Sequence, residues 1–123
     1  TEAEAIAASA QSFVIPRGLG RCYGDASLAN TIISTEKFNN FLSFDDQTGL
    51  LQCQSGVSLK EILDVFVPRG WFLPVTPGTK YITVGGAVAS DVHGKNHHSE
   101  GSFSRHVHAL TIYTPAKGLV TCS

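Results

Sequence analysis

A glycine-rich segment, PRGLGRCYGD at Pro16–Asp25, limits the possible folds more than any other feature of this chain. Its glycines, at positions 18, 20 and 24, interrupt both helical and strand patterns, so residues 17–30 are predicted to form a structured loop. Such glycines let a backbone approach a ligand closely and turn successive N–H groups the same way, which creates an anion-binding nest. The preceding apolar run, Phe13–Ile15, predicts a buried strand that ends at Pro16.

The spacing of these glycines differs from that of a dinucleotide-binding fingerprint. Gly18 and Gly20 are followed by Gly24 rather than by a glycine three residues on, and no helical pattern continues the turn. A Rossmann site is therefore not predicted. A phosphate-binding loop, with charge added by Arg17 and Arg21, and a plain connecting loop both remain open. Cys22 is either a reactive thiol or simply a small side chain.

A second candidate segment, PGTKYITVGGAVASD, covers residues 77–91. Thr83 is a suitable N-cap for a short helix of small residues from Gly85 to Ala89. Small residues at a helix start permit close contact with a phosphate or a ring, and the helix dipole favours an anion. The same composition also suits tight packing of a helix on a sheet, and both interpretations stay open.

The third candidate segment, residues 93–108, contains all five histidines together with Lys95. Histidine is a common metal ligand and acid–base group near neutral pH, so a metal site has to be considered. His93 and His97 would share one face of a helix, but Gly94 disfavours a helix there, and no cysteine or carboxylate falls at a zinc spacing. No metal ligand is predicted, and a polar loop around an organic ligand is the alternative. His106 and His108 are expected to alternate at the entry to a strand.

The remaining pattern mixes short helices and strands, which predicts an α+β or α/β fold. A capping box at Thr1 and Glu4 predicts a helix over residues 1–12, and a second, at Ser58 and Glu61, predicts a helix ended by Pro68–Gly70. Strands are predicted at 31–35, 50–54, 110–113 and 119–121, the last two joined as a hairpin.

Composition excludes several classes of function. Nine Lys and Arg residues against ten Asp and Glu residues give a formal charge of -1, so no nucleic-acid partner is predicted. No apolar run reaches the roughly 20 residues of a membrane span. Three cysteines without a CxxC pair suit a reducing compartment, hence the cytoplasm. The chain has no methionine and stops just after a predicted hairpin, so we expect a piece of a longer protein.

The three segments, in this order, resemble the flavin-binding domain of the vanillyl-alcohol oxidase superfamily, also called the PCMH-type FAD-binding fold. RGLGRCYGD resembles the RGLGRSYGD of the decaprenylphosphoryl-ribose oxidase branch, with Cys22 in place of serine. PGTKYITVGGAVASDVHGKNHHSEGSFSRHV resembles the second flavin segment of that branch, and HGKNHH is its most specific part. The likeness runs from about Pro16 to the end of the chain.

The resemblance implies an α+β fold of two small α/β subdomains, about 1–75 and about 76–123, with the second truncated. It implies FAD as the cofactor, with a pyrophosphate loop and a ring-side segment. The loop residues are Arg17, Gly18, Leu19, Gly20, Arg21, Cys22, Tyr23 and Gly24, continued by Gly78, Thr83, Val84, Gly85 and Gly86. His93, Gly94 and Asn96 would pass close to the flavin ring, and His93 and Lys95 are the candidate catalytic residues.

Many relatives bond the flavin covalently through a histidine of the first loop. Arg21 stands at the matching position here, so the resemblance implies non-covalent FAD. The implied reaction is hydride transfer from a carbinol carbon to the flavin, while a base accepts the hydroxyl proton. A separate cap domain supplies substrate contacts and a catalytic lysine in such proteins, so the isolated piece is expected to be inactive.

The implied substrate is the 2′-hydroxyl of a polyprenyl-phosphoryl ribose, oxidised by the flavin subunit of an epimerase used in cell wall polysaccharide biosynthesis. The expected partners are a lipid-linked or free sugar, an NAD(P)-dependent reductase subunit, and a membrane surface reached through the substrate. A sugar-alcohol or aldonolactone oxidase of the same superfamily is the alternative within this family. A non-catalytic ligand- or metal-binding module built on the histidine-rich segment is the alternative from another class.

Overall fold

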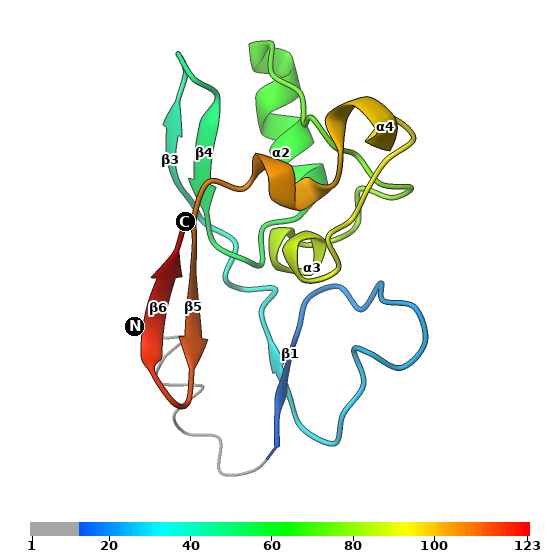
Figure 1. Ribbon diagram of the computed structural model, residues 1–123, viewed down its shortest axis with the longest axis vertical. Helices are drawn as coiled ribbons and strands as arrows, with labels where there is room; N and C mark the ends of the chain where they lie inside the picture. Colours follow the sequence, from blue (N-terminus) through cyan, green and yellow to red (C-terminus); the bar gives the residue numbers. More distant parts are fainter. Residues whose placement is uncertain (1–12) are drawn as a thin grey trace.

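The computed structural model describes residues 13–123, so the helix predicted over residues 1–12 lies outside the described part. The architecture is α+β, with three separate two-stranded sheets around short helices (Figure 1). The elements are β1 (Ile15–Arg17), β2 (Ile32–Ser34), β3 (Phe41–Asp45), β4 (Leu50–Cys53), α2 (Leu59–Phe66), η1 (Val67–Arg69), α3 (Val84–Ala89), α4 (His97–Glu100), η2 (Phe103–His106), β5 (Leu110–Thr114) and β6 (Gly118–Cys122).

The parallel pair β1–β2 fixes both ends of the glycine-rich loop. The prediction that Pro16 ends the first strand is wrong, because Pro16 lies in the middle of β1, opposite Ile33. In a parallel ladder alternate residues bond to the same neighbour, and here Ile15 N donates to Thr31 O (3.4 Å) while Arg17 O accepts from Thr35 N (2.9 Å). The absent N–H of Pro16 therefore faces away from β2 and costs the ladder nothing.

The hydrophobic core lies between the β3–β4 hairpin and α2. Phe66 of α2 packs on Phe44 of β3 with their ring centroids 4.4 Å apart. The buried residues of this cluster are Val57, Leu59, Ile62 and Phe66, with Ile82, Val84 and Phe103 packed against them. Because this core takes side chains from both sides of position 75, the division into subdomains at 75/76 stays a prediction.

The start of α2 is built as its sequence predicts. The Ser58 hydroxyl accepts a hydrogen bond from Glu61 N (3.1 Å), and Ser58 N donates to the Glu61 carboxylate (2.7 Å), which completes a capping box. The backbone hydrogen bond from Ser58 is the main reason why the pKa of Glu61 lies below its ordinary value. Past α2, the η1 turn follows before Gly70 leaves the helical conformation at φ 89°.

The C-terminal half packs Val84 of α3 and Phe103 of η2 against the core and extends the β5–β6 hairpin away from the helices (Figure 1). Thr83 is the N-cap of α3, as predicted, since its hydroxyl accepts from Gly86 N (3.1 Å). The hairpin turns at residues 115–117, also as predicted. The expectation for His106 is wrong: it lies in η2, not in an alternating strand entry, and its Nε2 bonds with Glu100 O (2.9 Å).

The cap of α2 generates the first testable prediction. Ser58→Ala removes the hydroxyl that accepts from Glu61 N, so the free energy of unfolding should fall by about 1 kcal/mol. Urea unfolding of the chain, followed by far-UV circular dichroism, measures this change. Ser34→Ala is the matched control, because Ser34 is exposed in β2 and should leave the unfolding midpoint where it is. Equal midpoints for Ser58→Ala and the unchanged chain would contradict the prediction.

Candidate cofactor-binding site

The glycine-rich loop presents a row of unengaged backbone donors. Within residues 13–123, none of the seven N–H groups from Gly18 to Gly24 donates a hydrogen bond to a protein acceptor. Gly20 and Gly24 adopt positive φ angles of 66° and 58°, a backbone conformation that favours glycine. Most backbone donors in folded proteins find a protein partner or water, so a run of seven without a protein acceptor marks a surface able to bind an anion.

Close approaches explain why glycine is needed at two positions of this loop. A Cβ atom added to Gly18 would lie 2.5 Å from Thr83 Oγ1, so the loop rests directly against the N-cap of α3. A Cβ added to Gly20 would lie 2.6 Å from Arg17 Nη2, so the Arg17 guanidinium folds over the loop backbone. The structure thus brings the first and second predicted segments together and sets one cation beside the unengaged donors.

The other predicted loop residues point to solvent. The exposed residues are Leu19, Arg21, Cys22, Tyr23 and Gly24, and the side chain of Tyr23 is fully exposed. Gly78 is exposed as well, and nothing lies within 4 Å of a Cβ added there. These residues lie exposed around the site.

The start of α3 differs from the glycine-rich loop in its hydrogen bonding. Val84 N donates to Val57 O (2.7 Å), Gly85 N to Ser55 O (2.9 Å), and Gly86 N to the Thr83 hydroxyl (3.1 Å). These three donors are therefore engaged inside the protein. Contact between this segment and a cofactor would come from its small, partly exposed surface rather than from its N–H groups.

The third segment is attached to the chain that precedes Gly78. Asn96 Nδ2 donates to Pro74 O (3.1 Å), and a Cβ on Gly94 would lie 2.5 Å from Thr76 O. His93 and Lys95, the candidate catalytic residues, are both exposed on this segment. The structure thus holds the His93–Asn96 stretch against residues 74–76, with its polar side chains accessible.

Asp91 organises this segment, and no pattern in the sequence predicts this role. Its Oδ2 accepts from Ser102 Oγ (2.8 Å) and its Oδ1 accepts from Ser104 N (2.9 Å). These hydrogen bonds, the one from Ser104 N above all, hold the pKa of the Asp91 carboxyl below its ordinary value. Asp91 has φ 43°, a left-handed conformation that Asp tolerates better than most residues but that no sequence pattern announced.

Three histidine rings follow one another, with His97 between His93 and His98. The ring centroids of His93 and His97 are 5.4 Å apart, and those of His97 and His98 are 3.9 Å apart. His97 Nδ1 lies 3.2 Å from Gly94 O, which orients that ring. Among residues 13–123, no group of three or more His, Cys, Asp or Glu side chains is arranged to hold a metal ion.

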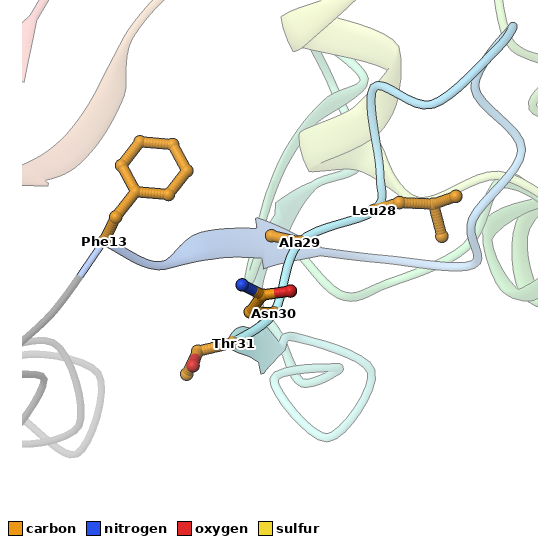
Figure 2. Close-up of a pocket in the computed structure, with 5 residues that line it drawn as sticks. All are labelled: Phe13, Leu28, Ala29, Asn30 and Thr31. Carbon is orange, nitrogen blue, oxygen red and sulfur yellow. The ribbon is translucent and has the colours of Figure 1, made fainter.

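A separate surface depression lies away from these residues. It has a volume of about 460 Å³ and is lined by Phe13 and by residues of the chain returning to β2, namely Leu28, Ala29, Asn30 and Thr31 (Figure 2). None of the predicted cofactor-binding residues lines it.

In the described part of the chain, no helix has both the length and the apolar character required to cross a membrane.

Comparison with known proteins assigns the family. A family model described as an FAD binding domain matches residues 2–123. Decaprenylphosphoryl-beta-D-ribose oxidase of Mycolicibacterium smegmatis is 45% identical over 103 residues, which cover 82% of this chain and 22% of that protein. D-lactate dehydrogenase of Anaerostipes hadrus is 33% identical over 89 residues, covering 72% of this chain and 19% of that protein.

A solved structure confirms the predicted fold. Alkyldihydroxyacetonephosphate synthase superposes with a TM-score of 0.76 at 22% identity, covering 89% of this chain and 22% of that one. The chain therefore spans about a fifth of the length of the relatives that it matches. The α+β fold is the PCMH-type fold, and FAD is the cofactor. On these grounds the chain belongs to the FAD-binding domain family.

Proposed function

We propose that this chain is the FAD-binding part of an oxidoreductase that oxidises the 2′-hydroxyl of a polyprenyl-phosphoryl ribose, with FAD held non-covalently. The identity of 45% to a relative named for this kind of substrate supports the choice over D-lactate, since the relative named for lactate is 33% identical. The observation that carries the proposal is the run of unengaged N–H groups from Gly18 to Gly24 beside the Arg17 guanidinium.

The residues of the loop fit the pyrophosphate of FAD. A pyrophosphate presents several anionic oxygens, and a row of backbone donors with an adjacent guanidinium satisfies them without needing any particular side chain. A Cβ atom at Gly18 would clash with Thr83 and one at Gly20 with Arg17, so the loop needs glycine at both positions to keep this shape. Gly18 to Gly24 would hold the pyrophosphate, and the small surface of Gly85 and Gly86 would lie beside the cofactor.

Bound FAD supplies the two-electron acceptor for an alcohol oxidation. The chain's own contribution to the reaction comes from the His93–Asn96 stretch. His93 orients the substrate hydroxyl and holds its proton, while Lys95 steadies an anionic substrate. Both side chains are exposed, so a substrate can reach them without displacing part of the core.

The remaining parts of the proposal concern partners and location. A lipid-linked sugar requires that the protein work at a membrane surface, and a cytoplasmic position suits three free cysteines, of which Cys22 and Cys122 are exposed. An NAD(P)-dependent reductase subunit would complete an epimerisation by reducing the keto sugar.

The substrate is tested by anaerobic bleaching of the flavin in the complete protein that contains this chain. A short-chain polyprenyl-phosphoryl ribose should bleach it, whereas bleaching by D-lactate alone would refute the proposal.

The second testable prediction concerns the loop. Gly20→Val should abolish FAD retention by the complete protein, because a β-branched residue disfavours φ 66° and its Cβ would displace Arg17. Arg21→Ala should retain most of the flavin, since backbone donors rather than this exposed side chain hold the pyrophosphate. Flavin absorbance per protein after gel filtration measures both.

Gly70→Val is the matched control for this substitution. Gly70 also has a positive φ, 89°, but lies after η1 with nothing within 4 Å of an added Cβ. It should carry the same backbone strain and keep its FAD. If Gly20→Val retained as much flavin as Gly70→Val, the loop would not be part of the site.

The third prediction concerns the linkage of the flavin. Because Arg21 stands where a covalent anchor would be, acid precipitation of the complete, yellow protein should release all flavin to the supernatant. Absorbance of the pellet and the supernatant at 450 nm gives the partition. Flavin that stays with the washed pellet would overturn the non-covalent assignment.

The fourth prediction separates chemistry from binding. His93→Ala and Lys95→Ala should keep bound FAD but slow its reduction by the ribose substrate, on the order of 10²–10⁴-fold for a lost acid–base group. Anaerobic stopped-flow measurement of flavin bleaching reports this step directly. Lys117→Ala, in the turn between β5 and β6, is the control and should reduce at the normal rate. Normal rates in the His93 and Lys95 variants would exclude both residues from catalysis.

A further inference from the structure

We propose that Asp91 is a positioning residue of this site, which holds the His93–Asn96 stretch in place by joining the two ends of the loop that carries it. The inference rests on the proposed function, because that function assigns the roles of His93 and Lys95. Asp91 itself would touch neither substrate nor cofactor. Its action would pass through the backbone on which the two candidate catalytic residues stand.

Two carboxylate hydrogen bonds tie the outgoing end of the loop to the returning end. Asp91 Oδ2 accepts from Ser102 Oγ (2.8 Å), and Oδ1 accepts from Ser104 N (2.9 Å). The backbone pairs at the same place, since Phe103 N donates to Val92 O (2.8 Å) and His93 forms an antiparallel bridge with Ser102. His93 therefore lies inside a closed loop whose base is the Asp91 side chain.

The backbone of Asp91 also connects this loop to α3. Asp91 N donates to Val88 O (3.1 Å), and Val92 N donates to Ala87 O (3.1 Å). At its other end, α3 meets the glycine-rich loop where Gly18 lies against Thr83. A continuous path of hydrogen bonds and contacts thus runs from the predicted pyrophosphate loop through α3 to Asp91 and on to His93.

The conformation of Asp91 indicates that its surroundings hold it. Among residues 13–123 it is the only non-glycine residue with a positive φ, 43°. Sparsely populated backbone conformations persist where neighbouring interactions over-determine them, and they gather at functional sites. Here the interactions are the two carboxylate bonds and the two backbone bonds to the end of α3.

The far side of the loop is fixed separately. Asn96 Nδ2 donates to Pro74 O (3.1 Å), and the Gly94 backbone approaches Thr76 O too closely to admit a Cβ. With Asp91 at one end and residues 74–76 at the other, Lys95 and His93 are carried on a segment held at both ends. Without the Asp91 hydrogen bonds (the clamp), the segment would be held only by its contacts with residues 74–76. Of the two candidate catalytic residues, His93 is the nearer to Asp91 in the sequence.

A simpler role for Asp91 is to cap η2 and stabilise the domain. Two substitutions distinguish the roles. Asp91→Gly removes both acceptors but accepts φ 43° without strain, so its cost to global stability is limited. Asp91→Asn keeps one oxygen acceptor and tolerates the left-handed conformation, so it should rescue the clamp. Asp46→Gly is the matched control, since Asp46 is an exposed carboxylate in the β3–β4 turn.

The first experiment tests the clamp in the 123-residue chain, without FAD. Amide hydrogen exchange is measured by NMR for Phe103 and Ser104, the two N–H donors at the loop base. In Asp91→Gly their exchange should be about tenfold faster or more, while exchange of the α2 amides is unchanged. Asp91→Asn and Asp46→Gly should exchange at close to the normal rate. Unchanged exchange at Phe103 and Ser104 in Asp91→Gly would overturn the proposal.

The second experiment tests the consequence in the complete protein loaded with FAD. Asp91→Gly should retain flavin and slow its saturating-substrate reduction by a short-chain polyprenyl-phosphoryl ribose, on the order of 10–100-fold, because the catalytic groups are misplaced. Asp91→Asn should restore most of the rate. A purely stabilising role predicts instead a lower melting temperature and lower flavin content with a normal rate per bound flavin, and that result would overturn the proposal.

The His93→Ala variant makes the two possible failures distinguishable. If His93→Ala slows reduction and Asp91→Gly does not, the positioning role is wrong and the proposed function stands. If neither slows reduction while Asp91→Gly opens the loop base to exchange, the assignment of His93 is wrong and the positioning role falls with it. Slow reduction in both, with rescue by Asp91→Asn, supports the proposal.

Discussion

The arrangement of the domain depends on two helix N-caps that are buried against one another. Ser58 begins α2 and Thr83 begins α3, and the two residues form an antiparallel bridge. Leu59 N donates to Ile82 O (2.9 Å) and Val84 N to Val57 O (2.7 Å), so each helix start satisfies donors that a helix leaves open. Thr83 is 3% exposed, and Gly18 lies directly against it, which sets the position of the glycine-rich loop. The bridge between Ser58 and Thr83 therefore joins the hydrophobic core to the glycine-rich loop.

The site has two surfaces, which differ in whether their backbone N–H groups are engaged inside the protein. The N–H groups at the start of α3 are engaged by Val57 O, Ser55 O and the Thr83 hydroxyl, while those of Gly18–Gly24 have no acceptor in residues 13–123. Both segments are rich in glycine, yet only the loop offers donors to an anion. Glycine in α3 serves close packing, since a Cβ on Gly85 would lie 3.0 Å from Ser55 Cβ. Glycine in the loop allows the positive φ angles of Gly20 and Gly24 and also the close approach of Gly18 to Thr83.

Local signals predicted much of this structure correctly. The capping box at Ser58, the N-cap at Thr83 and the β5–β6 hairpin all rest on hydrogen bonds between residues close in sequence, so short patterns reveal them. The expectation for Pro16 is wrong because the effect of its missing N–H depends on which edge of β1 that position faces, and only the pairing with β2 decides this. The expectation for His106 is wrong because His106 lies in η2, and the residues at the start of η2, Ser102 and Ser104, donate to Asp91 from a distant part of the sequence.

The sequence by itself determined the family and the cofactor and predicted three segments that would meet it, because the resemblance rests on motifs of consecutive residues, the glycine-rich loop and HGKNHH. The tertiary structure alone decided which backbone donors are free, how near Gly18 lies to Thr83, and that Asp91 closes the loop carrying His93. These features join residues that are far apart in the chain, or depend on a backbone angle that several residue types can adopt. Tertiary packing selects among these alternative conformations and pairings, because the free energy that favours one of them comes from contacts between residues that no short segment contains.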